Sequence, residues 1–222
     1  MTLVSAHRCL TRADIESAIA LGADFVEFDV QRCADGSLVL HHDPVEVVPD
    51  GSLGYDDALD LIAGRARAHL DLKFEGDEVP VVARAVARLG TDHLLVTTLH
   101  DAAVRAVRDW SDEEGHDLEV GLSLGRGVGG FRLWEALKVR LSELWPGVRY
   151  GHSRANVMVA HHWLARLRVR RFARRHRLPL VVWTVDTPGS LKYWMRPGRA
   201  WLVTTNEPAL ALSLRRADTL RP

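Results

Sequence analysis

Short apolar runs alternate with helical segments along nearly the whole of this 222-residue chain. Leu3–Ser5 is one such run, and Arg12–Leu21 follows it with apolar residues at helical spacing and a terminating Gly22. The same order of strand and helix recurs about eight times, without a break in composition or a Pro/Ser-rich linker. Because strands that are joined through helices pair in parallel, the pattern predicts a parallel sheet covered by helices.

The residue pattern predicts nine strands and eight helices along the chain. The strands are Leu3–Ser5, Phe25–Val30, Ser37–His41, Ala68–Lys73, Leu94–Thr97, Glu119–Leu124, Asn156–Val159, Leu180–Val185 and Trp201–Thr204. The helices are Arg12–Leu21, Asp56–Ala63, Val79–Leu89, one that Asp101 caps and that runs to Trp110, one that follows Gly130 and ends near Leu144, His162–His176, Pro188–Met195 and Glu207–Arg216. This α/β pattern favours a single-domain TIM (β/α)8 barrel over residues 1–222, and an open doubly wound sheet is the alternative.

Composition narrows the classes of partner. Basic and acidic residues balance at 29 each, so there is no global electrostatic case for a nucleic-acid partner. No run approaches the roughly eighteen apolar residues of a transmembrane helix, and the N-terminus lacks the features of a signal peptide. The two cysteines, Cys9 and Cys33, do not make a disulfide framework, although geometry would allow one bridge. We therefore expect a reduced, cytoplasmic protein.

Residues with reactive side chains stand at or just past the ends of the predicted strands. They are His7, Glu27, Asp29, His42, Asp71, Lys73, Trp183 and Asp186. Barrels of this class carry their chemistry at the C-terminal ends of the strands. Chance placement of polar surface residues would not put so many reactive side chains at strand ends. Their positions therefore predict an active site at the C-terminal rim of the barrel.

Carboxylates at this rim have the spacing of a metal site. Glu27 and Asp29 are two apart in a strand, so their side chains point to the same face, and Asp71 ends a neighbouring strand. Three carboxylates suit a hard divalent cation, Mg²⁺ or Ca²⁺, better than zinc. His7 and His42 could then serve as base and acid on opposite sides of a phosphorus atom.

Short motifs also follow one another in a characteristic order from His7 to Pro208. They are His7-Arg8, Leu21-Gly22-Ala23-Asp24, Val26-Glu27-Phe28-Asp29-Val30, Asp35-Gly36, Val39-Leu40-His41-His42-Asp43-Pro44, Leu70-Asp71-Leu72-Lys73, Val182-Trp183-Thr184-Val185-Asp186 and Thr204-Thr205-Asn206-Glu207-Pro208. Each motif alone is weak, but in combination they are specific. Together they resemble the glycerophosphodiester phosphodiesterase family.

The resemblance implies a TIM barrel that hydrolyses phosphodiesters with a divalent metal. It implies His7 and His42 as the catalytic pair, Glu27, Asp29 and Asp71 as metal ligands, Arg8 and Lys73 as phosphate contacts, and Trp183 as a wall of the substrate pocket. In such enzymes a glycerol hydroxyl attacks the neighbouring phosphorus, one histidine takes its proton and the other protonates the leaving alkoxide. Water then opens the cyclic phosphate, and the metal neutralises charge on the phosphoryl oxygens.

Departures from the family pattern leave other functions open. Cys9 stands where the family has glycine, the Pro-Glu-Asn loop that would supply a fourth carboxylate is absent, and Asn206 replaces an aspartate. The short first loop is similar to that of sphingomyelinase D and phospholipase D toxins. That similarity implies a lyase that releases a cyclic phosphate from a lysophospholipid or sphingolipid. A weakened barrel that only binds a phosphate ligand is the third interpretation.

Each candidate residue also has a simpler interpretation. His41 and His42 could be ordinary polar residues at a strand end; the family register, in which the histidine precedes Asp-Pro, selects His42 as the catalytic one. Asp71 and Lys73 could form only a structural ion pair. Trp183 could equally belong to the core, because tryptophan in a strand is usually packed there.

Two segments fall outside the motifs. Gly125–Gly130 fits a dinucleotide-binding GxGxxG, but no strand ending in an acid follows at the required distance, so a barrel loop is predicted. Arg166–Arg177 holds seven arginines and no acid, on a helix whose apolar face is expected to pack inward. That apolar face comprises Trp163, Leu164, Leu167 and Phe172. A solvated helix is the simplest interpretation, and peripheral contact with an anionic membrane is the alternative.

Overall fold

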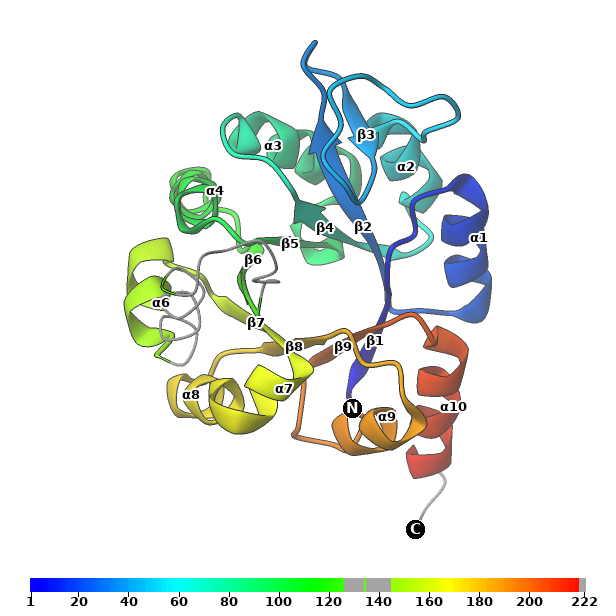
Figure 1. Cartoon of the computed structure of the whole chain (residues 1–222), viewed down its shortest axis with the longest axis vertical. Coiled ribbons are helices and arrows are strands. Elements are labelled where there is room, and N and C mark those ends of the chain that lie inside the picture. The colour runs from blue at the N-terminus through cyan, green and yellow to red at the C-terminus, as the bar shows by residue number, and fades with distance from the viewer. Residues whose placement is uncertain (126–133, 135–144, 220–222) are drawn as a thin grey trace.

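Eight parallel strands close into a barrel in the part of the chain that the computed structural model describes, residues 1–125, 134 and 145–219 (Figure 1). They are β1 (Leu3–Ala6), β2 (Phe25–Arg32), β4 (Arg67–Leu72), β5 (Leu94–Thr98), β6 (Glu119–Leu124), β7 (Val157–His161), β8 (Leu180–Trp183) and β9 (Leu202–Thr205). β1 pairs in parallel with both β2 and β9, which closes the ring. The predicted TIM (β/α)8 barrel is confirmed, and the open sheet is excluded.

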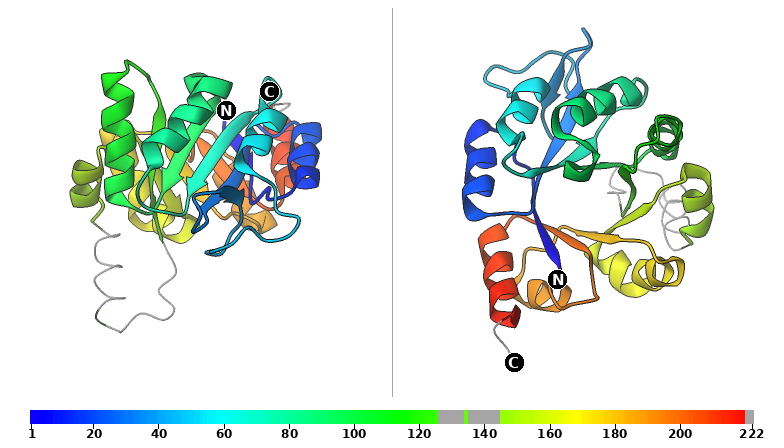
Figure 2. Two further views of the ribbon diagram at one scale, coloured as in Figure 1. Left: turned by 90° about the horizontal axis from the view of Figure 1, so that it is seen from above. Right: turned by 180° about the vertical axis from the view of Figure 1, so that it is seen from behind.

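Helices surround this ring on all sides (Figure 2). They are α1 (Arg12–Leu21), α2 (Tyr55–Ile62), α3 (Glu78–Leu89), the 3-10 helix η1 (Thr91–His93), α4 (Asp101–Glu113), α6 (Gly147–Ser153), α7 (His162–Leu164), the π-helical turn η2 (Ala165–Val169), α8 (Arg170–His176), α9 (Pro188–Trp194) and α10 (Pro208–Thr219). The glycine-rich loop beyond Gly125 and the helix predicted to end near Leu144 lie outside the described residues. Among the described helices, none has the length and apolar character that crossing a membrane requires. Cys9 and Cys33 are both free and buried.

The predicted strand Ser37–His41 does not belong to the ring. It forms β3 (Leu38–Leu40), which pairs antiparallel with the outer half of β2 after a turn at Gly36, where φ is 87°. Because β3 runs back toward the barrel, its end returns to the level of Asp29, and the His41 amide donates to the Asp29 carbonyl at 3.1 Å. This return places the following residue, His42, beside the barrel rim.

The ends of two helices illustrate how local sequence sets these elements. Thr11 caps α1 through a reciprocal capping box with Asp14, and Gly22 ends it in the left-handed region at φ 77°. The prediction that Asp101 caps α4 was wrong. His100 occupies the cap position, while the Asp101 carboxylate pairs with Arg149 and is therefore not available as a cap.

Side chains alternate between the two faces of each barrel strand. On β2, Val26, Phe28 and Val30 point outward and pack against the surrounding helices. The inward positions begin with Phe25, which joins Leu95, Val157, Val159, Val181 and Leu202 in an apolar cluster at the N-terminal end of the barrel. Gly121 permits this close packing, because a Cβ there would lie 2.5 Å from a methyl carbon of Val159. Beyond this cluster, toward the C-terminal ends of the strands, the inward positions include the polar residues Glu27, Asp29 and His69.

Candidate active site

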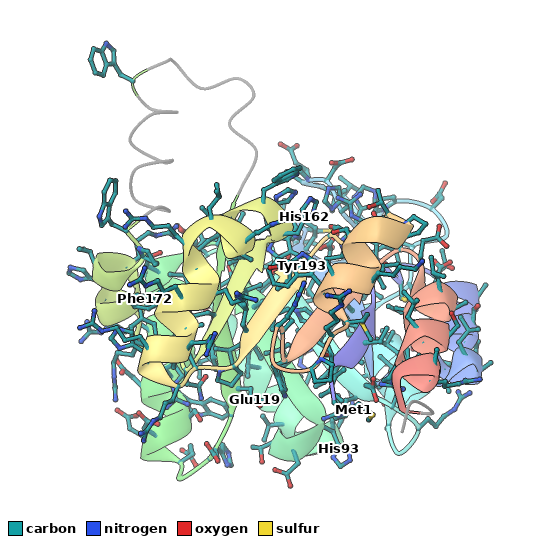
Figure 3. All side chains as sticks on the ribbon, turned by 90° about the horizontal axis from the view of Figure 1, so that it is seen from below. Met1, His93, Glu119, His162, Phe172 and Tyr193 are labelled. Atoms are coloured by element: carbon teal, nitrogen blue, oxygen red, sulfur yellow. The ribbon has the colours of Figure 1, made fainter. Side chains whose placement is uncertain are left out.

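A cavity of about 290 Å³ opens at the C-terminal ends of the strands. All eight predicted site residues line it: His7, Arg8, Glu27, Asp29, His42, Asp71, Lys73 and Trp183. The opposite end of the barrel is marked by Met1, His93 and Glu119 in Figure 3. The fold thus gathers residues from β1, β2, β4, β8 and the segment after β3 around one opening.

Three carboxylates meet at the floor of this cavity. Asp29 and Asp71 are register partners on β2 and β4, and Glu27 lies two positions below Asp29 on the same inward face. One ligand oxygen from each of the three lies within 4.8 Å of the others, and Glu27 and Asp29 are only 3% and 1% exposed. Burial, together with the charges of Asp29 and Asp71, raises the pKa of Glu27 well above its ordinary value.

Lys73 is the nearest positive charge to this cluster. Its Nζ lies 2.8 Å from Asp29 Oδ1 and also forms an ion pair with Asp71. Burial disfavours the ammonium, but the carboxylates of Asp71 and Asp29 outweigh this effect and raise the pKa of Lys73. One lysine does not balance three converging carboxylates. An all-oxygen donor set with this charge fits a hard divalent cation such as Mg²⁺ or Ca²⁺.

His42 is held between a carboxylate and a guanidinium. Its Nδ1 lies 2.6 Å from Asp29 Oδ2, and its Nε2 lies 2.7 Å from an Arg8 nitrogen. A carboxylate only accepts and a guanidinium only donates, so the ring is the neutral Nδ1–H tautomer. The neighbouring His41 points away: its Nδ1 donates to the Asp43 carbonyl at 2.8 Å, and it does not line the cavity.

His7 is held by a hydrogen-bonded chain that the sequence did not predict. Its Nδ1 lies 2.9 Å from Asn206 Oδ1, and Asn206 Nδ2 donates to Asp186 Oδ2 at 2.8 Å. The Asp186 carboxylate accepts from Asn206 Nδ2, so the amide oxygen of Asn206 must face His7, whose Nδ1 therefore carries the proton. Nε2 is left as an acceptor, 3.9 Å from Glu27 Oε2. Burial lowers the pKa of His7, which keeps that nitrogen unprotonated.

The backbone after β1 takes a strained conformation to reach the carboxylates. Arg8 has φ 54°, in the left-handed region that few residues other than glycine adopt. This turn points the Arg8 amide at Glu27 Oε2, at 2.6 Å, and the next amide, Cys9, donates to the Glu27 carbonyl at 2.8 Å. Strain of this kind persists where the surrounding contacts enforce it. Here it fixes the position of Glu27.

Two further residues of the cavity were missed by sequence reasoning. His69 lies under the carboxylates, with Nδ1 3.2 Å from Ser5 Oγ and Nε2 3.1 Å from Thr97 Oγ1. It is two positions before Asp71 on the same strand, so the alternation of side chains along a strand would have predicted that both point into the barrel. Thr204 is the second missed residue: it lines the cavity, and its Oγ1 is buried without a partner among the described residues. The same holds for Nε1 of Trp183, which the sequence did predict.

Comparison with known proteins points to one family. The model of the glycerophosphoryl diester phosphodiesterase family matches residues 10–121, about half of the chain. This range contains the three carboxylates, His42 and Lys73, and leaves out His7, Arg8 and Trp183. No curated protein matches the chain.

Solved structures share the whole fold. A glycerophosphodiester phosphodiesterase from Agrobacterium tumefaciens is 18% identical, with a TM-score of 0.72 over 97% of this chain and 100% of that one. One from Parabacteroides distasonis is 17% identical, with a TM-score of 0.74 over 98% of both chains. A phosphodiesterase from Oleispira antarctica, in complex with the product sn-glycerol-3-phosphate, is 17% identical, with a TM-score of 0.70 over 96% of both chains. At these identities the likeness is one of fold.

Proposed function

This chain belongs to the glycerophosphoryl diester phosphodiesterase family, and on that premise we propose that it hydrolyses glycerophosphodiesters to an alcohol and glycerol phosphate with a divalent cation. One observation carries the proposal. His7 and His42 stand at different edges of one carboxylate cluster, and each ring is held through its Nδ1, by Asn206 and by Asp29 respectively. Two oriented imidazoles beside a candidate metal site are the groups that acid–base cleavage of a phosphodiester requires.

Glu27, Asp29 and Asp71 are the residues proposed to hold the cation. When bound, Mg²⁺ or Ca²⁺ would neutralise charge on the phosphoryl oxygens of the substrate. Lys73 would be released in part from its two carboxylates by the added positive charge, and its ammonium could then contact the phosphate. Arg8, whose side chain is half exposed at the opening, is the second proposed phosphate contact.

The two histidines are proposed to have different tasks. His7 has a low pKa and a bare Nε2, so it would accept the proton of the glycerol hydroxyl next to the phosphate. Once Arg8 has turned to the phosphate, His42 Nε2 would take up a proton from solvent, with Asp29 at Nδ1 stabilising the imidazolium, and would give that proton to the leaving alkoxide. Water would then open the cyclic phosphate with the histidines in reversed roles, by microscopic reversibility.

Two donors without partners support a substrate that is rich in oxygen. Trp183 Nε1 and Thr204 Oγ1 are buried in the cavity wall and bond to no described residue. A buried donor without a partner is unfavourable, and a bound acceptor relieves that penalty. Glycerol hydroxyl and phosphoryl oxygens are such acceptors. The glycerol phosphate held by the Oleispira antarctica protein is consistent with a ligand of this size.

The alternative product is a cyclic phosphate. Among the described residues, the candidate metal cluster has three carboxylates, and the first loop adds none. Phosphorus NMR of the products separates the two functions, because a cyclic phosphate that accumulates as the end product would refute the hydrolase proposal. A panel of glycerophosphodiesters and lysophospholipids, with Mg²⁺ and Ca²⁺ in parallel, identifies the leaving alcohol and the preferred ion.

The third interpretation, a barrel that binds without turnover, is tested by the same assay. If His7→Ala and His42→Ala turn over substrate as fast as the wild type with metal present, the acid–base proposal fails. A cytoplasmic location is also part of the proposal, and the two free, buried thiols of Cys9 and Cys33 support a reducing compartment.

A further inference from the structure

The flank of the barrel formed by α6, α7, η2 and α8 exposes large apolar side chains. Trp145, Val148, Trp163 and Leu167 are 55%, 69%, 64% and 72% exposed. Single exposed apolar residues are ordinary, but a group of them on adjoining helices marks an interaction surface.

These side chains are exposed because the helix packs through other residues. Ala165, Val169 and Ala173, spaced four apart, are fully buried against the barrel. Trp163 and Leu167 are also four apart, but they lie on the opposite side of the same helical segment. The prediction that they pack inward with Leu164 and Phe172 was therefore wrong for two of the four. Small residues lie deepest in the contact with the barrel, and Trp163 and Leu167 face solvent.

The same flank is strongly basic. Nine arginines and no acid occur between Glu143 and Asp186. Arg149 and Arg154 pair with acids of α4, whereas none of the other seven, from Arg166 to Arg177, forms an ion pair within the described residues. Arg168 instead lies over the Trp145 ring at 5.0 Å. A groove between α6 and α8 is lined by both kinds of side chain, including Val148, Leu167, Arg168, Arg171 and Arg175.

This flank continues to the rim of the active site. His162 and Trp163 directly follow β7, and they line a hollow that shares Thr184 with the catalytic cavity. In Figure 3, His162 and Tyr193 lie toward the rim, and Phe172 lies farther down the same flank. A flat partner that covered the flank would thus lie beside the mouth of the cavity.

We propose that the Trp–Arg surface, made of Trp145, Val148, Trp163, Leu167, Arg168, Arg171 and Arg175, docks the protein on a membrane that contains anionic phospholipids. Tryptophan prefers the level of the lipid headgroups, and arginine keeps its charge among phosphates while its stem lies along apolar surface. Exposed aliphatic residues between the arginines gain from partial insertion into the acyl boundary. A nucleic acid would bind the arginines but would leave the apolar side chains of Val148 and Leu167 unused. A second copy of this chain would bring its own basic surface, and the two like-charged surfaces would repel each other.

Co-sedimentation with vesicles tests this proposal without reference to turnover, so its result is independent of the proposed activity. The wild type should sediment with phosphatidylcholine vesicles that contain phosphatidylglycerol, and not with phosphatidylcholine alone. High salt should release it, because salt screens attraction to the surface charge. Failure to sediment, or equal binding to neutral vesicles, overturns the proposal.

Matched variants identify the surface responsible. Arg168→Glu/Arg171→Glu should weaken partitioning at low salt roughly 30-fold or more, and Leu167→Ser should also weaken it at low salt, through lost apolar contact with the bilayer. The control Arg12→Glu/Arg216→Glu makes the same change in charge on α1 and α10, on the far side of the barrel (Figure 1). Binding by the control should equal that of the wild type.

All of these side chains are exposed, and thermal melting followed by circular dichroism should show each variant folded. Equal loss of vesicle binding in the control overturns the proposal. So does a stable dimer in light scattering that the Arg168→Glu/Arg171→Glu variant alone abolishes, or binding of RNA that competes fully with the vesicles.

Discussion

His69 makes the stability of the barrel depend on pH in a way that can be calculated. The ring is buried between Ser5 and Thr97, and burial lowers its pKa from 6.5 to about 3. Thr97 Oγ1 donates to Asp71 Oδ1 at 2.8 Å, so it must accept from His69 Nε2–H, and Nδ1 accepts from Ser5. The folded protein therefore holds a neutral imidazole.

The sign and size of the effect follow from the two pKa values. Below pH 6.5 the unfolded chain binds a proton at His69 that the folded chain does not bind, so the free energy of unfolding falls as pH falls. The slope approaches about 1.4 kcal/mol per pH unit between pH 6.5 and 3. Between pH 7 and pH 5 the wild type should therefore lose about 2 kcal/mol through this residue alone.

Urea denaturation at pH 7 and pH 5, with EDTA in both buffers, measures this loss. His69→Gln keeps a donor for Thr97 and an acceptor for Ser5 but cannot titrate. The wild type should lose about 2 kcal/mol more than this variant over the interval. His93→Gln, at an exposed imidazole near the N-terminal end of the barrel, serves as control and should behave as the wild type. Equal losses in the wild type and His69→Gln would refute the reasoning.

Three substitutions test the cavity itself. Asp71→Asn removes one of the three carboxylates and should weaken Mg²⁺ or Ca²⁺ binding at least about tenfold by calorimetry; unchanged affinity would remove Asp71 from the metal site. Asn206→Leu deletes the partner of His7 Nδ1 and should lower kcat about tenfold with little change in KM, whereas a change in KM alone would contradict an orienting role. Thr204→Val removes an unpartnered hydroxyl, so KM should rise several-fold while Tm stays level or rises; an unaltered KM would mean that no substrate oxygen binds there.

The carboxylate site could be predicted because it depends only on strand periodicity and on the parallel pairing of neighbouring strands. Glu27 and Asp29 share the inward face by the period of two, and the parallel register brings Asp71 opposite Asp29. His42 could not be predicted in this way. It reaches the rim only because β3 folds back antiparallel on β2, so its place came from the motif and not from the rule about strand ends.

Two features could not be predicted from the sequence: the contact between Asn206 and His7, and the side of the α7–η2 segment that faces the barrel. Asn206 meets His7 across 199 positions, because closure of the barrel aligns Ala6 of β1 with Thr205 of β9. On α7 and η2, both the large and the small apolar residues recur at helical spacing. The prediction placed the larger residues, Trp163 and Leu167, against the barrel, but they are the exposed ones. Close packing against the barrel selected Ala165 and Val169, whose small side chains let the helix approach.

Phosphorus NMR of glycerophosphocholine incubated with the protein tests the central claim most directly. With Mg²⁺ or Ca²⁺ added, the diester resonance should be replaced by that of glycerol phosphate, and EDTA or His42→Ala should stop the conversion. Conversion that continues undiminished in EDTA would contradict the metal site of Glu27, Asp29 and Asp71. A spectrum that ends at a cyclic phosphate, or that never changes with any glycerophosphodiester, would contradict the proposed hydrolysis.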